Sequence, residues 1–308
     1  MSAVGVLGGA MSGDGPSTDV SRPVDDGRPT TWLNIAHANG YPPRCYRALA
    51  EALSQGFCVV GPPTREMAAE DRDGWAGLTT WRPLADDLIA SLDALDAEHD
   101  TGPVIGLGHS LGGVLTLYAA ARRPDRFAGV VLIDPVFLLP EVIAWLMAQG
   151  DEGESPRASL VQGAVQRRNA WPDAAAAFAH FRPKPVFARF DDDVLRDYVA
   201  GALTDDGAGG LTLTISREWE AQIYRTPPTD VWDVLPQLTV PTLAIRGAES
   251  DTLSAAAWER WRALQPSATF VELAGVGHLL PFEAPAAVAA VILDRFASQP
   301  VAVRAGPS

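Results

Sequence analysis

Short apolar runs alternate with longer stretches of helical periodicity along most of the chain, and this alternation limits the fold more than any other feature. Runs typical of buried strands occur at residues 31–36, 57–60, 104–107, 130–133, 242–246 and 269–273. Helical stretches occur at residues 44–54, 81–98, 111–122, 255–264 and 285–296. Because short buried strands alternate with helices, the pattern predicts an α/β fold with a mostly parallel central sheet and helices on both faces.

The alternation is lost for roughly a hundred residues, from 136 to 236. This segment contains helical pieces, acidic turns and four tryptophans, and the strand–helix alternation returns after it. A long interruption between two strands of one sheet favours an insertion over a second independent domain. We therefore expect a core formed by residues 29–135 and 237–300, with an inserted helical cap at residues 136–236.

The two ends of the chain offer little apolar material to bury. Residues 1–28 are rich in Gly, Ser, Asp and Pro, and residues 301–308 are similar, so both predict flexible tails. No apolar run reaches the ~18 residues that span a bilayer. A secretory signal requires a basic residue before its apolar region, and no basic residue precedes the first apolar run of this sequence. We therefore expect a cytoplasmic protein without a membrane partner.

Charge and cysteine content exclude several classes of protein. The formal net charge is −14, which would repel nucleic acid. The chain has only two cysteines, Cys45 and Cys58, too few for a disulfide framework or a cysteine-built zinc site. The sequence leaves the oligomeric state open.

The strongest local motif is Gly-His-Ser-Leu-Gly at residues 108–112, between a predicted strand and a predicted helix. A serine hydroxyl becomes a useful nucleophile when it is exposed beside a base and beside donors for an oxyanion. A tight strand-to-helix turn exposes the hydroxyl, and the helix N-terminus supplies backbone N–H groups. The flanking glycines permit that turn. The motif therefore predicts Ser110 as a nucleophile.

A general base is expected at His278, in the loop that follows the last predicted strand. A base must be free to reach the serine, and a loop beyond a strand end allows this. The other four histidines are less suitable: two lie on polar stretches, one lies inside the serine turn, and His37 ends a strand on the oxyanion side.

The acid that orients the histidine has three candidates. Asp251 is preferred, because it follows the strand at residues 242–246 and precedes His278 in the chain. Asp134, at the end of the strand after the serine helix, is the first alternative. Glu249, on the same loop as Asp251, is the second. Each could also be an ordinary turn-former or helix cap.

An oxyanion hole is expected from two backbone N–H groups. One would be the N–H of Leu111, directly after the nucleophile. The other would come from residues 37–40, which read His-Ala-Asn-Gly, with Asn39 preferred over Ala38. Each such donor contributes about 3–4 kcal/mol to transition-state stabilisation.

Together these residues resemble the α/β-hydrolase superfamily, over nearly the whole length between the two tails. The chain order Ser110, Asp251, His278 is that of the superfamily. Residues 241–251 and 275–285 are similar to its last two strand-loop units. The resemblance implies an α/β-hydrolase fold with an inserted helical cap.

The resemblance narrows to the capped, epoxide-hydrolase-like branch of that superfamily. There the loop at residues 37–40 usually reads His-Gly-x-x, and Ala38 replaces the glycine in this chain. Residues 61–65, Gly-Pro-Pro-Thr-Arg, stand where relatives usually carry an Asp-rich turn. Epoxide hydrolases and haloalkane dehalogenases use an aspartate nucleophile, so Ser110 argues against both activities and favours attack on a carbonyl carbon.

We therefore expect a serine hydrolase of small carboxylic esters, thioesters or lactones, acting through an acyl-enzyme intermediate. Two other functions remain open: cleavage of a C–C bond beside a ketone by the same residues, and ligand binding without turnover on the same fold. The expected partner is a small-molecule carbonyl substrate. We expect no metal and no organic cofactor.

Overall fold

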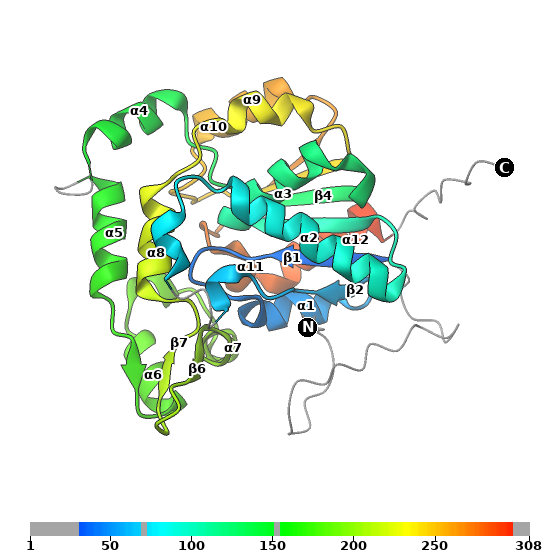
Figure 1. Ribbon diagram of the computed structural model, residues 1–308. Coiled ribbons are helices and arrows are strands. Elements are labelled where there is room, and N and C mark those ends of the chain that lie inside the picture. Colours follow the sequence, from blue (N-terminus) through cyan, green and yellow to red (C-terminus); the bar gives the residue numbers. More distant parts are fainter. Residues whose placement is uncertain (1–30, 69–72, 151–154, 298–308) are drawn as a thin grey trace.

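The centre of the molecule is a six-stranded parallel sheet (Figure 1). The computed structural model describes residues 31–68, 73–150 and 155–297. The strands are, in sheet order, β2 (Cys58–Val60), β1 (Trp32–Ala36), β3 (Val104–His109), β4 (Phe127–Ile133), β8 (Thr242–Gly247) and β9 (Thr269–Leu273). Every neighbouring pair is parallel. The predicted sheet is confirmed, whereas the predicted tails at 1–28 and 301–308 lie outside the described residues.

Helices cover both faces of this sheet. The face in front in Figure 1 carries α2 (Arg82–His99) and α3 (Leu111–Arg122), with α9 (Val231–Val234) and α10 (Ala255–Leu264) packed in the same cluster. The opposite face carries α1 (Arg47–Leu53), α11 (Leu280–Glu283) and α12 (Pro285–Phe296). Successive strand residues point to opposite faces. Val104 accordingly packs with the first group, and Ile105 and Leu107 pack with the second.

The predicted helix bounds hold where the apolar pattern is strong. Helices α3, α10 and α12 have the bounds that the periodicity predicts. The predicted helix at 44–54 is divided into a 3₁₀ turn and α1, and a proline occupies the first position of that turn. Among the described residues, the 3₁₀ turns are η1 (Pro43–Tyr46), η2 (Arg65–Met67), η4 (Gly74–Gly77), η5 (Pro124–Arg126), η6 (Pro185–Phe187) and η7 (Leu235–Gln237).

Most of the segment between β4 and β8 lies along one side of the sheet, at the left in Figure 1, whereas α9 lies at the top. Its longer helices are α4 (Pro140–Ala148), α5 (Pro156–Gln166), α6 (Ala174–Phe181), α7 (Asp192–Ala202) and α8 (Arg217–Arg225). It also contains a small antiparallel sheet of β5 (Ala170–Trp171), β7 (Leu211–Leu213) and β6 (Leu203–Asp205). The sequence predicted only helices here, because strands of two or three residues are too short to show periodicity.

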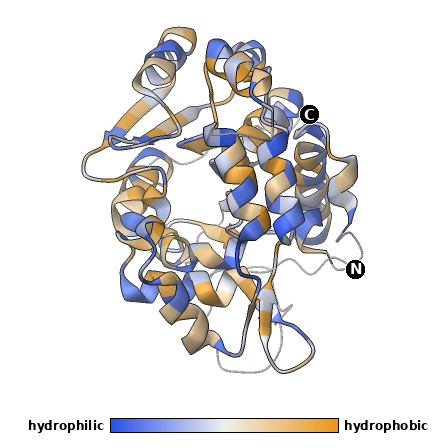
Figure 2. Ribbon diagram, turned by 90° about the vertical axis from the view of Figure 1, so that its left-hand side faces the viewer, coloured by the Kyte–Doolittle hydropathy of each residue, from blue (hydrophilic) through white to orange (hydrophobic). Residues whose placement is uncertain are grey.

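Both hydrophobic and hydrophilic residues occur along the helices of this side (Figure 2). On α4, Trp145 and Met147 remain about half exposed, at 49% and 48%. None of the helices in the described part of the chain is long and apolar enough to cross a bilayer.

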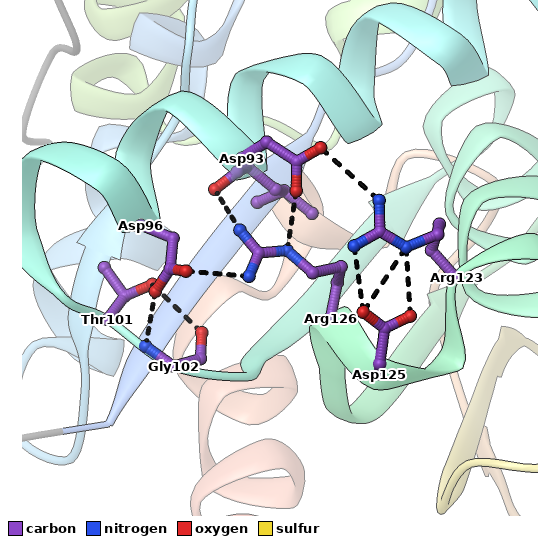
Figure 3. A network of polar contacts seen from close by, with 8 residues as sticks. Asp93, Asp96, Thr101, Gly102, Arg123, Asp125 and Arg126 are labelled. Atoms are coloured by element: carbon purple, nitrogen blue, oxygen red, sulfur yellow. Dashed lines mark hydrogen bonds and ion pairs between the residues drawn. The ribbon is translucent and has the colours of Figure 1, made fainter.

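A network of charged side chains fastens the end of α2 to the turn before β4 (Figure 3). The guanidinium of Arg126 donates to Asp96 Oδ2 at 2.8 Å and to the Leu92 carbonyl at 3.0 Å. It also lies 2.9 Å from Asp93 Oδ1. Asp96 Oδ1 in turn accepts from the Gly102 N–H at 2.8 Å, just before β3. The network therefore fixes α2 relative to β3 and β4, which carry site residues.

We expect Arg126→Met to lower the free energy of unfolding by about 1–2 kcal/mol at pH 7, measured by urea denaturation. The Arg126 hydrogen bond is the largest cause that lowers the pKa of Asp96. The contribution of this pair is therefore complete above the unfolded pKa of aspartate, about 3.9, and disappears as the pH falls through the lower folded pKa. The matched control is Arg122→Met, whose exposed pair with Asp86 contributes less than about 1 kcal/mol. Equal losses in both variants, or a loss at Arg126 that does not shrink at low pH, would contradict this account.

Candidate active site

The serine of the sequence motif occupies a strained turn between β3 and α3. Ser110 has φ 56° and ψ −114°, a conformation that residues other than glycine rarely adopt. Its N–H donates to the Ile133 carbonyl at 3.0 Å, which holds the turn against the end of β4. Its side chain is mostly buried, with the residue 8% exposed.

Backbone contacts explain the glycines on both sides of this serine. A Cβ at Gly108 would lie 2.2 Å from the Gly112 carbonyl oxygen, and a Cβ at Gly112 would lie 1.9 Å from the Ala36 carbonyl oxygen. The Gly112 N–H donates to the His37 carbonyl at 3.1 Å. The first turn of α3 therefore lies directly on the end of β1 and on the loop at 37–40.

His278 lies in the loop between β9 and α11 and reaches the serine. Its Nε2 is 3.0 Å from Ser110 Oγ. Glu283 supports the loop by accepting the Gly277 N–H at 2.7 Å. The His278 carbonyl accepts a hydrogen bond from His109 Nε2 at 2.9 Å. Hydroxyl and imidazole, 168 residues apart in the chain, are thus within hydrogen-bond distance.

The carboxylate beside His278 belongs to Asp134, directly after β4. Its Oδ1 lies 3.7 Å from His278 Nδ1 and its side chain is fully buried. Two groups hold the carboxylate: the Ser250 hydroxyl donates to Oδ1 at 2.8 Å, and the Gly247 N–H donates to Oδ2 at 3.4 Å. This 3.7 Å separation is longer than a hydrogen bond.

The structure does not bring Asp251, the acid preferred from the sequence, to His278. Its side chain is exposed and accepts from the Thr252 hydroxyl at 3.3 Å, and it makes no contact with His278 within the described residues. The second alternative, Glu249, is exposed and pairs with Arg189. The loop after β8 contributes the Ser250 hydroxyl to the site, and the carboxylate comes from the neighbouring strand β4.

The loop at 37–40 is held from two directions. The Ala38 N–H donates to the Tyr46 hydroxyl at 2.9 Å, so this N–H has an internal acceptor. The Asn39 side chain donates to the Glu220 carbonyl of α8 at 3.0 Å. Of the two loop residues considered from the sequence, Ala38 therefore has its backbone N–H already bonded within the protein. Leu111 is the first residue of α3, where N–H groups have no intrahelical acceptor.

A charged pair from the segment between β4 and β8 lies beside this loop. Arg167 donates to the Glu220 carboxylate and, at 3.0 Å, to the Tyr198 hydroxyl. A Cβ at Gly40 would lie 3.4 Å from the Glu220 carboxylate. Burial, the largest effect, raises the pKa of Tyr198 to about 12, so its hydroxyl stays protonated. The pair is mostly buried, with side-chain exposures of 17% and 12%.

Four supporting residues were not predicted from the sequence: Tyr46, Glu220, Ser250 and Glu283. Tyr46, Glu220 and Ser250 contact site residues that are distant in the sequence, whereas Glu283 contacts Gly277 only six residues away. Ser250 was nearest to detection, because it lies in the loop expected to carry the acid. Over the described ranges, no three His, Cys, Asp or Glu side chains gather as a metal ion would require.

Comparisons with known proteins agree with this fold. The model of the alpha/beta hydrolase family matches residues 35–291. Lipase LipV of Mycobacterium tuberculosis is 28% identical over 264 residues, covering 82% of this chain and 88% of the lipase. Monoglyceride lipase of Rattus norvegicus is 27% identical over 112 residues, which is 36% of this chain and 37% of that protein. The crystal structure of E-2-(acetamidomethylene)succinate hydrolase superposes with a TM-score of 0.68 at 22% identity, covering 86% of this chain and 90% of that chain.

We expect Gly112→Ala to destabilise the protein by about 3 kcal/mol or more, because its Cβ would meet the backbone oxygen of Ala36 and not a movable side chain. Guanidinium denaturation followed by circular dichroism measures the change. Gly163→Ala, within α5 and with open space around the added Cβ, is the control and should not lose stability. A Gly112→Ala protein as stable as wild type would mean that α3 can move away from β1.

Proposed function

The chain belongs to the alpha/beta hydrolase family, and on that premise we propose that it is a serine hydrolase that cleaves a small carboxylic ester, thioester or lactone. The observation that carries the proposal is the 3.0 Å contact between His278 Nε2 and Ser110 Oγ at a strained strand-to-helix turn. Strained backbone conformations occur mainly at functional sites in proteins. The lipase names of two relatives also favour ester substrates.

In the proposed reaction, Ser110 Oγ attacks the carbonyl carbon of the substrate while His278 Nε2 takes the hydroxyl proton. The carbonyl oxygen gains negative charge as the tetrahedral intermediate forms. The backbone N–H groups of Leu111 and Asn39 would hold this oxyanion, each contributing about 3–4 kcal/mol. The N-terminus of α3 adds a favourable field at the same place.

The proton on His278 then passes to the leaving alcohol, and the acyl group remains on Ser110 as an ester. Water, deprotonated by His278, attacks this ester. As the second intermediate collapses, His278 returns the proton to Ser110 Oγ, and the acid and the free serine are released. We propose that Asp134 stabilises the imidazolium in both steps. Its carboxylate faces Nδ1 and is kept in place by Ser250 and Gly247.

We further propose that residues 136–236 are a cap over this site. The support is the contact between α8 and the loop at residues 37–40, the proposed oxyanion loop. In this contact the Asn39 side chain donates to the Glu220 carbonyl. A cap in this position would enclose the substrate and exclude bulk water, which strengthens the electrostatic contacts of the reaction.

Replacing the nucleophile is the direct test. We expect wild-type protein to be labelled by a fluorophosphonate probe and to hydrolyse p-nitrophenyl esters, and Ser110→Ala to lose both activities. Labelling without turnover of esters of any acyl length would point to another carbonyl substrate, such as a ketone beside a cleavable C–C bond. Absence of labelling in folded wild-type protein would overturn the proposal and favour a ligand-binding protein.

A pair of matched substitutions tests the acid. We expect Asp134→Asn to lower kcat about 10³–10⁴-fold, because an amide cannot stabilise the imidazolium. Asp251→Asn, the same chemical change on an exposed side chain, should leave kcat within about twofold. Steady-state ester hydrolysis measures both, and thermal unfolding checks that each variant is folded. A large loss at Asp251 with a small one at Asp134 would return the role to Asp251.

A further inference from the structure

A continuous chain of three hydrogen bonds, two buried and the third partly buried, lies beneath the site and joins its parts. The Ala38 N–H donates to the Tyr46 hydroxyl at 2.9 Å. The Tyr46 hydroxyl contacts His109 Nδ1 at 2.8 Å, and His109 Nε2 contacts the His278 carbonyl at 2.9 Å. Ala38, Tyr46 and His109 are 3%, 1% and 0% exposed, so water does not compete for the two bonds that join them.

The chemistry of the end groups sets the direction of every bond in the chain. The Ala38 N–H can only donate, so the Tyr46 oxygen accepts there and its own proton remains for His109. The His278 carbonyl can only accept, so His109 carries its proton on Nε2 and accepts on Nδ1. Donors and acceptors therefore match throughout, with His109 as a neutral imidazole.

Burial, the largest cause, holds the pKa of His109 well below its usual range, in agreement with a neutral ring. Its ring centroid is 5.2 Å from that of His278. A charge on His109 would oppose formation of the His278 imidazolium at this distance. Phe282 packs against both Tyr46 and His109, with ring centroids 4.7 and 5.9 Å away, so an aromatic ring covers one side of these hydrogen bonds.

The chain of hydrogen bonds connects three backbone segments whose relative positions matter for the proposed reaction. Ala38 directly precedes Asn39, the proposed oxyanion donor. His109 directly precedes Ser110. The third piece is the backbone of His278, the proposed base.

Resting on the proposed function, we propose that Tyr46 and His109 are positioning residues, which hold the oxyanion loop and the base histidine in fixed places relative to the nucleophile. Neither side chain touches the reacting atoms. Their effect is to keep two catalytic groups from drifting, and a misplacement of about 1 Å can lower a rate roughly 10²-fold. The effect falls on the transition state, where the oxyanion and the imidazolium exist, and therefore on kcat more than on KM.

Tyr46→Phe removes the central hydroxyl and keeps the ring. We expect the rate of fluorophosphonate labelling and the kcat for p-nitrophenyl esters to fall about tenfold, with KM within twofold of wild type. His109→Gln keeps a side-chain N–H for the His278 carbonyl and removes the acceptor for Tyr46, so it breaks the same link. The double variant should therefore be no slower than the slower single variant, because the two changes act on one chain.

Tyr118→Phe is the matched control, since Tyr118 is also a buried tyrosine, lies on the helix that begins after Ser110, and donates its hydroxyl to Asp230. It should keep kcat within twofold of wild type whatever its effect on thermal unfolding. The total extent of labelling after long exposure gives the folded fraction of every protein, so rates can be compared per folded site. If Tyr46→Phe does not fold, His109→Gln tests the same link.

Labelling of wild type and of both single variants at equal rates, or rate losses that multiply in the double variant, would overturn the positioning role and leave the proposed hydrolase intact. A loss confined to thermal stability would do the same. Failure of wild-type protein to react with the probe would instead overturn the proposed function, and this inference with it. The two failures are therefore distinguishable.

Discussion

The position of the serine turn follows from the contact between the first turn of α3 and the end of β1. Gly112 lies so close to Ala36 that no side chain fits between them, and its N–H is bonded to the His37 carbonyl. This contact fixes the start of the helix, and with it the strained backbone of Ser110, whose conformation costs of order 1–3 kcal/mol. Packing of α3 against the parallel sheet offsets that cost, because the helix is buried over ten of its twelve residues.

The fold and the Ser110–His278 contact could be anticipated because both leave local marks in the sequence. Buried strands are continuous apolar runs, the helices show their period, and the serine turn needs glycines within two residues on each side. His278 follows from its place after the last strand. The antiparallel strands β5, β6 and β7 have too few residues to leave such marks, and their pairing depends on contacts across the segment between β4 and β8.

The carboxylate that faces His278 could not be identified from the sequence, and the reason is geometric. Strands β4 and β8 are parallel neighbours, with Ile133 opposite Ile245, so their carboxyl ends lie side by side at the same edge. Asp134 and Asp251 both follow these ends, and chain order permits either. The path of the loop after β8 determines which carboxylate is buried. This loop turns the Ser250 hydroxyl inward to Asp134 and leaves the carboxylate of Asp251 exposed. A buried carboxylate requires such partners, and Asp134 has them.

The loop at residues 37–40 is hydrogen-bonded to two separate parts of the protein. From the core, Tyr46 accepts the Ala38 N–H. From the segment between β4 and β8, the Glu220 carbonyl accepts from the Asn39 side chain, and the Glu220 carboxylate is itself held by Arg167. The first bond fixes the loop relative to the nucleophile turn, and the second makes its position depend on where α8 lies. A displacement of α8 would have to break the Asn39 bond or carry the loop with it. Since the loop is also bonded to the core through Ala38, the oxyanion site proposed here depends on the contact between the loop and α8.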